Sequence, residues 1–276
     1  MDWLKPSALA AAMMEAGAAK GNLPARTILV TGILSGLFLG FTTTLFVSAL
    51  VATGNLVVSA MFFPVGFILL VLLGLELFTG NAALLPYAGM AGRLSFGSIV
   101  SGLVLVYVGN LIGSLLYAAL FAAIDTKFFT AAADPIGAKI AAIAALKTIP
   151  YMKAGAAGWM TAFSKGVVCN WMVSLGAVMA LVSRSVIGKI FAMYMPIMAF
   201  VAQGFEHCVV NMFVIPCGIM LGAKVSISQW WIWNEIPVTL GNIVGAVVIT
   251  AFGLYVAHGA TAAPEPVLSP APAPAE

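Results

Sequence analysis

Six long stretches of the sequence consist almost entirely of apolar residues, and this feature restricts the chain to few folds. They cover approximately residues 26–53, 61–85, 96–124, 159–182, 190–221 and 236–257. A helix of about 20 apolar residues crosses a bilayer, and it satisfies its backbone hydrogen bonds internally. The sequence therefore predicts an all-α membrane protein with six transmembrane helices.

The composition excludes several other classes of protein. Charged residues make up 8% of the 276 residues, and hydrophobic residues make up 62%. Soluble domains carry about 25% charged and 45–50% apolar residues. An ordinary soluble enzyme, a nucleic-acid-binding protein and a disordered chain are therefore excluded. The three cysteines lie in apolar stretches without the spacing of a disulfide framework or a metal site, and we expect no metal and no cofactor.

We divide the chain into three regions. Residues 1–25 are expected to hold a short helix on the cytoplasmic membrane surface, because Leu9, Met13 and Ala16 fall on one helix face. The first 22 residues also lack the apolar core of a cleavable signal peptide. Residues 26–258 form the transmembrane domain, and residues 259–276 a disordered, proline-rich tail. Six crossings put both termini on one side, and the arginines near the short loops favour the cytoplasm for that side. We expect a multi-pass protein of the bacterial inner (plasma) membrane.

An internal repeat divides the transmembrane domain into two halves. The pattern G-x-E-x4-N-x4-P occurs at Gly74–Pro86 and again at Gly204–Pro216. The pair Gly109-Asn110 has its counterpart in Gly241-Asn242. Each half, about 26–124 and 159–257, holds three spans, so the second half enters the membrane from the opposite side. This is an inverted-topology repeat.

The repeated pattern places a carboxylate, an amide and a proline inside the second and fifth spans. Such residues are costly against lipid, but they are tolerated where a helix breaks and lines a cavity. We expect both spans to be broken, the second at Gly80-Asn81, and to meet near the bilayer midplane. That is the geometry of a transport site in many carriers.

Four segments in order resemble the formate/nitrite transporter family of bacterial anion channels. They are Glu76–Gly80, Lys165–Trp171, Gly204–His207 with Asn211-Met212, and Ile236–Thr239 with Gly241-Asn242. The resemblance covers roughly Lys5 to Val256, and Leu75 departs from it, because the family usually has a small residue there. The resemblance implies an aquaporin-like protomer, a homopentamer with one pore in each protomer, and helix breaks at Leu77-Phe78-Thr79 and near Gly204.

The resemblance also implies roles for individual residues. It places His207 at the centre of the pore with Thr79 and Asn170 beside it. It implies an outer constriction of Phe63 and Phe200 and an inner one of Phe67 and Leu77. Phe78, in the first broken loop, is also expected to be a constriction residue.

Other candidate residues are polar or charged. We expect Lys153 and Lys165 to attract anions in the outer vestibule, although Lys153 could equally be a solvated loop residue. A second group supports the helix breaks: Glu76, Glu206, Asn81, Asn211 and Asn242. For the two glutamates we favour accepting hydrogen bonds from freed backbone groups over electrostatic tuning or proton exchange.

His207 is the only histidine inside a span, and ionisable residues there are usually functional. Together with the resemblance to the formate/nitrite transporter family, this implies a channel or transporter for small monovalent anions of weak acids such as formate or nitrite. Because an imidazole exchanges protons near neutral pH, transport is expected to be proton-coupled. The alternatives are a hydrosulfide, acetate or lactate channel of the same fold, and a neutral-solute or ammonium-type channel. We do not expect an enzyme, because no nucleophile has a base beside it.

Overall fold

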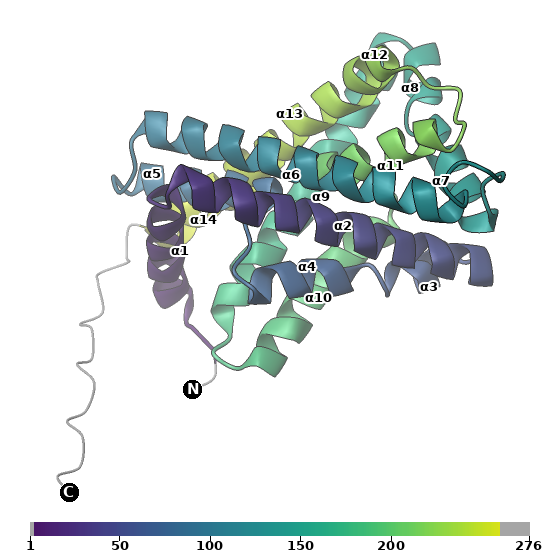
Figure 1. The fold of residues 1–276 in the computed structure, drawn as a ribbon. Coiled ribbons are helices and arrows are strands. Elements are labelled where there is room, and N and C mark those ends of the chain that lie inside the picture. Colours follow the sequence, from purple (N-terminus) through teal and green to yellow (C-terminus); the bar gives the residue numbers. More distant parts are fainter. Residues whose placement is uncertain (1–2, 260–276) are drawn as a thin grey trace, which may run out of the picture.

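The computed structural model describes residues 3–259, which form helices and turns and no β-strand (Figure 1). The first half contains α1 (Pro6–Gly21), α2 (Ala25–Thr53), α3 (Leu56–Ala60), α4 (Pro64–Leu72), α5 (Phe78–Met90) and α6 (Phe96–Asp125). The second half contains α7 (Pro135–Leu146), α8 (Ile149–Lys153), α9 (Ala156–Val182), α10 (Val186–Ala202), α11 (Cys208–Met220), α12 (Ile227–Trp230), η1 (Trp231–Glu235), α13 (Ile236–Val244), η2 (Gly245–Phe252) and α14 (Gly253–His258).

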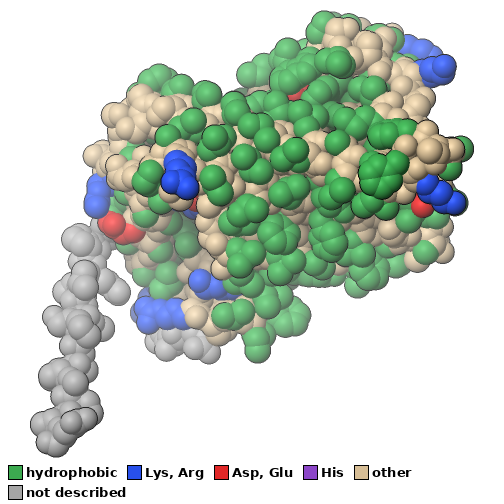
Figure 2. All heavy atoms as spheres, viewed as in Figure 1, with side chains coloured by type: hydrophobic (Ala, Val, Ile, Leu, Met, Phe, Trp, Pro, Cys, Tyr) green, Lys and Arg blue, Asp and Glu red, His purple; other side chains and the backbone are tan. Residues whose placement is uncertain are grey.

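Four helices of the described chain are long and apolar enough to cross a membrane. They are α2, α6, α9 and the continuous helix that runs from Ile227 to His258 through two π-helical segments. Apolar side chains cover the visible outer face, and lysines and arginines gather toward the ends (Figure 2). The chain is therefore a multi-pass membrane protein. The remaining apolar helices are shorter, so the count of six crossings stays a prediction.

Two breaks interrupt the shorter helices at equivalent positions of the repeat. Gly74 and Gly204 each take a left-handed conformation, with φ of +67° and +65°. Glycine adopts this conformation without a Cβ clash and commonly ends a helix. An extended stretch follows each glycine, after which α5 and α11 begin. The break near Gly204 agrees with the sequence prediction. The prediction of a break at Gly80-Asn81 is wrong, because both residues lie inside α5.

Close helix packing is also repeated in the two halves. The backbone of Gly32 on α2 approaches Gly109 on α6, and a Cβ on Gly32 would lie 3.3 Å from the Gly109 Cα. In the second half, a Cβ on Gly166 of α9 would likewise lie 3.3 Å from the Cα of Gly241 on α13. Small residues allow two membrane helices to approach in this way. The glycines of the repeat therefore set the spacing of its helices.

Short helices cover the two ends of the bundle. At one end, α1 packs across α5 and lies beside α14 (Figure 1). The site of closest approach is Gly17, where a Cβ would collide with the Leu84 carbonyl. The expected surface helix is thus packed against the bundle through buried residues such as Met13. At the other end, the connection 125–158 folds into α7 and α8. The expected proline-rich tail follows residue 259 and lies outside the described residues.

Candidate functional site

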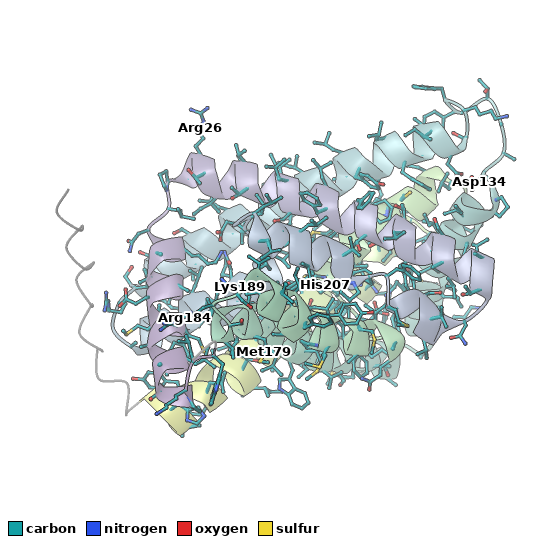
Figure 3. The ribbon with its side chains drawn as sticks, turned by 90° about the horizontal axis from the view of Figure 1, so that it is seen from below. Arg26, Asp134, Met179, Arg184, Lys189 and His207 are labelled. Atoms are coloured by element: carbon teal, nitrogen blue, oxygen red, sulfur yellow. The ribbon has the colours of Figure 1, made fainter. Side chains whose placement is uncertain are left out.

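Two cavities lie on either side of the helix breaks. One has a volume of about 240 Å³ and is lined by Lys20 on α1, Lys189 on α10 and residues around the first break, including Phe67 and Leu77. The other, of about 320 Å³, is lined by Lys147, Lys165 and residues around the second break, including Phe63, Phe200 and His207. The centre of the bundle, with His207, lies between the end that carries Arg26 and Arg184 and the end that carries Asp134 (Figure 3).

His207 is buried and joins the two broken helices. Its Nε2 atom lies 3.0 Å from the Thr79 hydroxyl, on the first turn of α5. Its Nδ1 atom accepts a hydrogen bond from the Val210 N–H at 3.2 Å, so the ring caps α11. A nitrogen that accepts carries no proton in the neutral ring, so the ring proton is assigned to Nε2. Nε2 then donates to Thr79, whose hydroxyl hydrogen is free to face another acceptor.

Asn170 on α9 holds the same region from the other side. Its amide donates to the Thr79 carbonyl at 3.2 Å and to the Asn242 carbonyl at 2.8 Å. The Asn170 Oδ1 atom is buried and accepts no hydrogen bond from the described residues. The three residues named for the central site, His207, Thr79 and Asn170, are thus brought together.

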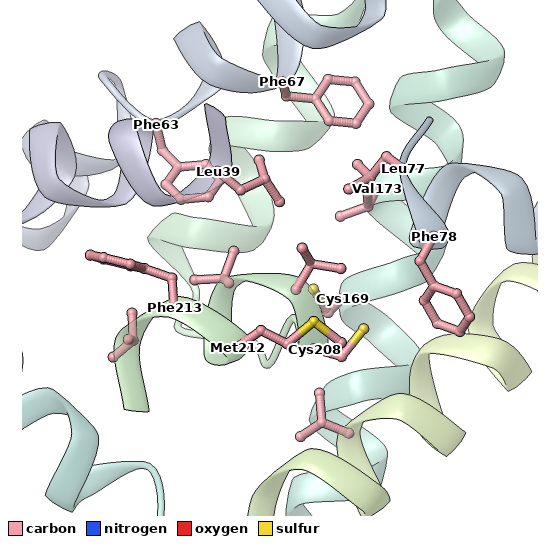
Figure 4. Close-up of a cluster of buried hydrophobic side chains, with 14 of the residues drawn as sticks. Leu39, Phe63, Phe67, Leu77, Phe78, Cys169, Val173, Cys208, Met212 and Phe213 are labelled. Atoms are coloured by element: carbon pink, nitrogen blue, oxygen red, sulfur yellow. The ribbon is translucent and has the colours of Figure 1, made fainter. Parts of the chain in front are cut away.

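Aromatic and aliphatic side chains flank this centre. The rings of Phe63 and Phe200 meet edge to face at 5.7 Å, and Phe200 stacks on His207 at 5.8 Å. Phe67 and Leu77 lie on the side of the other cavity. The ring of Phe78 points away from Phe63 and Phe67 (Figure 4). It is the first residue of α5, packs against Tyr107 and lines neither of the two cavities, so the structure does not bring Phe78 to the constriction that was expected to include it.

Two asparagines satisfy the backbone groups that the breaks set free. Asn110 donates to the Glu76 carbonyl and accepts from the Phe78 N–H. Asn242 donates to the Glu206 carbonyl and accepts from the Cys208 N–H. Buried backbone groups need such partners. Sequence reasoning assigned this role to Asn242 but omitted Asn110, although the repeat of Gly109-Asn110 and Gly241-Asn242 carried the signal.

The two glutamates of the repeat form buried ion pairs instead of accepting backbone hydrogen bonds. Glu76 pairs with Lys20 at 2.7 Å, and Glu206 pairs with Lys147 at 2.7 Å. The repeat asparagines orient these carboxylates: Asn81 donates to Glu76 and Asn211 donates to Glu206. We expected these carboxylates to accept hydrogen bonds from backbone groups freed at the breaks. The structure differs, because the side chains of Asn110 and Asn242 already occupy those positions.

Sequence reasoning singled out two other lysines. Lys165 is half-buried, lines the cavity next to His207 and lies over the Tyr151 ring, 5.9 Å from its centroid. Lys153 is exposed and lines neither cavity. The lysines that reach the glutamates were missed, because nothing in the sequence links Lys20 to Glu76 or Lys147 to Glu206 across more than 50 residues.

The described residues also show what chemistry the site can support. Residues 3–259 contain no group of three or more histidine, cysteine, aspartate and glutamate side chains that could hold a metal ion. All three cysteines are free and buried. The centre offers hydrogen-bond donors, one imidazole and apolar walls, and the cavities on both sides carry lysines.

The protein has two broken helices that meet at a buried histidine, with a cavity on each side. This arrangement is typical of membrane channels and transporters. The sequence model of the family described as "Formate/nitrite transporter" matches residues 7–256. The chain belongs to the formate/nitrite transporter family, as its sequence motifs indicated.

The names of related proteins agree with this assignment. The chain is 39% identical over 250 residues to the probable formate transporter of Methanothermobacter thermautotrophicus, covering 84% of this chain and 89% of that protein. It is 37% identical over 239 residues to the formate channel FocA of Haemophilus influenzae, covering 79% and 80%.

Two solved structures share the fold. One is a pentameric formate channel with formate bound, with a TM-score of 0.68 and 26% identity, covering 84% of this chain and 97% of that one. The other is an ion channel of the same family, with a TM-score of 0.75 and 26% identity, covering 91% and 98%. These relatives are channels and transporters and not enzymes.

Proposed function

We propose that the protein is a channel for small monovalent anions of weak acids, with formate as the first candidate substrate and nitrite as the second. The single observation that carries the proposal is the His207–Thr79 contact between the two broken helices, at 3.0 Å. It places a hydroxyl donor and a titratable ring between two lysine-lined cavities. Similarity to formate channels and a formate transporter supports the choice of formate.

The apolar walls explain why a proton is needed. Moving a bare carboxylate past rings such as Phe63 and Phe200 costs several kcal/mol or more, because nothing there replaces its water. Protonation removes most of that cost. In the proposed step, a protonated His207 gives its proton through Thr79 to formate, which leaves a neutral imidazole and neutral formic acid. His207 therefore serves as the central proton site, and Asn170 accepts from the acid.

The cap on α11 couples this step to local structure. Protonated histidine carries a hydrogen on both nitrogens, so Nδ1 must release the Val210 N–H before it can accept a proton. An N-cap bond contributes about 1 kcal/mol. Loading Nδ1 with a proton therefore loosens the first turn of α11. The proton that passes through Thr79 leaves from Nε2, so the cap forms again when the remaining ring proton moves from Nδ1 back to Nε2.

The two vestibules concentrate the substrate. Lys165 lines the cavity beside His207 and Lys189 lines the other, and neither forms an ion pair among the described residues, whereas Lys147 and Lys20 in the same cavities are neutralised by Glu206 and Glu76. Positive charge in a cleft raises the local concentration of anions. The aromatic pair Phe63–Phe200 and the pair Phe67–Leu77 form the two constrictions, and Phe78 supports the first break from outside them.

We propose that the chain works as a homopentamer in the plasma membrane, the inner membrane of a bacterium. The pentameric assembly of a similar formate channel supports the oligomeric state. Both termini are proposed to be cytoplasmic, because α1 and α14 lie at the same end and that end carries Arg26 and Arg184, together with Arg93, which pairs with Glu15 on α1. In this arrangement, α1 is a cytoplasmic helix, residues 26–258 form the pore domain, and the tail after Thr261 is dispensable.

Hydrosulfide, acetate, lactate or a neutral solute such as ammonia would use the same fold. Uptake by liposomes that contain the purified protein separates these substrates, with formate, nitrite and the alternatives tested with and without a pH gradient. The proposal predicts formate uptake that rises as the outside becomes more acidic. Rapid ammonia or lactate flux with no formate flux would overturn it.

A further inference from the structure

The helical segment that carries Phe63 differs from its counterpart in the second half of the repeat. The helices α3 and α4 together cover residues 56–72, and α10 covers residues 186–202, at the repeat offset of 130 (186 − 56). Whereas α10 is one continuous helix, the first-half segment is interrupted at residues 61–63. Phe63 lies directly before α4. The position of its ring in the constriction therefore depends on what holds this interruption.

The first turn of α4 has no cap of its own. The first four N–H groups of a helix lack a partner within that helix, and the residue before the helix commonly accepts from one of them through a side-chain oxygen. Here that residue is Phe63, whose side chain has no oxygen, and the helix begins with Pro64. The backbone around Phe63 therefore needs a polar partner from another part of the bundle.

Thr42 on α2 provides this partner. Its hydroxyl donates to the Phe63 carbonyl at 2.6 Å and accepts from the Gly66 N–H at 3.2 Å. Gly66 is the third residue of α4, and a capping threonine ordinarily accepts from the N–H at that position. A Cβ on Gly66 would lie 2.6 Å from the Thr42 Cβ, so glycine permits this close approach. Thr42 is fully buried and lines neither cavity, so it can act on the pore only through the segment it holds.

A second hydroxyl holds the interruption from the opposite side. Tyr194 on α10 donates to the Met61 carbonyl at 2.9 Å. Between these two attachments, the Phe63 ring packs edge to face against Phe46 at 6.3 Å and against Phe200 at 5.7 Å. The backbone of the interruption is thus tied to both α2 and α10, and these ties fix the ring that faces Phe200.

The repeat shows that Thr42 and the interruption occur together. Gly32 and Gly166 are equivalent and are 134 residues apart (166 − 32). The same offset pairs Thr42 with Gly176 (176 − 42), which has no side chain to donate or accept a hydrogen bond. The second half therefore lacks the hydroxyl at this position, and its helix α10 is uninterrupted. The threonine is present in the half whose helix needs a cap.

We propose that Thr42 is a positioning residue that, together with Tyr194, sets the size limit of the pore by holding the Phe63 ring against Phe200. The inference rests on the proposed function, in which these two rings form a constriction. A ring on a capped turn keeps one position and excludes acids larger than formate. A ring on a loosened turn yields to them. Loss of a cap of typical strength changes the population of the capped turn about fivefold.

The test is the ratio of acetate uptake to formate uptake by liposomes that contain the purified protein. Thr42→Val replaces the hydroxyl with a methyl group and should raise this ratio about fivefold. The pH dependence of formate uptake should stay that of the wild type, because His207 is unchanged. Thr42→Ser keeps the hydroxyl and should keep the wild-type ratio. Thr31→Val is the matched control on α2, since the Thr31 hydroxyl donates only to carbonyls of its own helix.

The uptake ratio does not depend on how much protein is folded, because both acids are measured on the same liposomes. A ratio for Thr42→Val at or below the wild-type value overturns the inference, and so does a serine variant that behaves like the valine variant. If Thr42→Val fails to assemble, Tyr194→Phe decides, since it removes the donor to Met61 and should also raise the ratio. An unchanged ratio in that variant overturns the inference. Wild-type protein that takes up no formate would instead refute the proposed function.

Discussion

Replacing Lys147 with methionine tests the buried ion pair of the second half. The Lys147 ammonium lies 2.7 Å from Glu206, and their side chains are 19% and 3% exposed. Methionine keeps much of the side-chain volume and removes the charge. Glu206 would then keep hydrogen bonds from Tyr151 and Asn211 but lose its only cation partner among the described residues.

The size of the effect follows from burial. Removing one partner of a buried ion pair costs about 3 to 5 kcal/mol, because the remaining charge stays buried without compensation. A change of 1 kcal/mol shifts the melting temperature of a chain of this size by about 2 to 4 °C. Lys147→Met should therefore lower the melting temperature by about 6 to 20 °C. The double variant Lys147→Met with Glu206→Gln should recover most of the loss, because a neutral amide needs no counter-charge.

The assay is thermal unfolding of the purified protein in one detergent at pH 7. Lys153→Met is the matched control, because Lys153 is exposed and forms no ion pair among the described contacts. It should melt with the wild type. The reasoning is refuted if Lys147→Met melts within 2 °C of Lys153→Met, or if the double variant is less stable than the single variant.

Three further predictions concern the breaks, the constriction and the assembly. Asn242→Asp keeps the acceptor for the Cys208 N–H but loses two donated hydrogen bonds, each contributing about 0.6 kcal/mol in a membrane helix bundle. The variant should therefore melt at a lower temperature than the wild type. An unchanged melting temperature would show that the break needs no such support. Phe200→Ala should let larger monocarboxylates pass while proton coupling persists. The measurement is liposome uptake of monocarboxylates of increasing size, with internal pH recorded. An unchanged size limit would show that Phe200 does not form the constriction. Native mass spectrometry should find five copies, and a stable monomer as the sole active species would contradict the assembly.

Much of the fold could be predicted from sequence because it depends on local patterns. The apolar stretches predicted helices, and the repeat predicted two equivalent breaks. The break near Gly204 was implied by the resemblance, and its physical basis is the left-handed backbone of Gly204, which ends the helix. The first break was misplaced at Gly80-Asn81, because Asn81 reads as a helix breaker although it serves as the partner of Glu76.

The site could be predicted only in part. His207 stood out because an ionisable residue inside an apolar stretch is costly. Lys20 and Lys147 could not be paired with Glu76 and Glu206, since those contacts depend on how α1 and α7 fold back over the bundle.

The central claim is that His207 couples proton and anion movement. The most direct test is formate flux through His207→Asn in liposomes, with internal pH recorded in the same experiment and pentameric assembly confirmed first. Asparagine can keep a hydrogen bond but does not carry a proton between pH 5 and 8. The account predicts that proton-coupled uptake falls strongly and that any remaining anion flux changes its pH dependence. Flux at the wild-type rate with the wild-type pH dependence would contradict it.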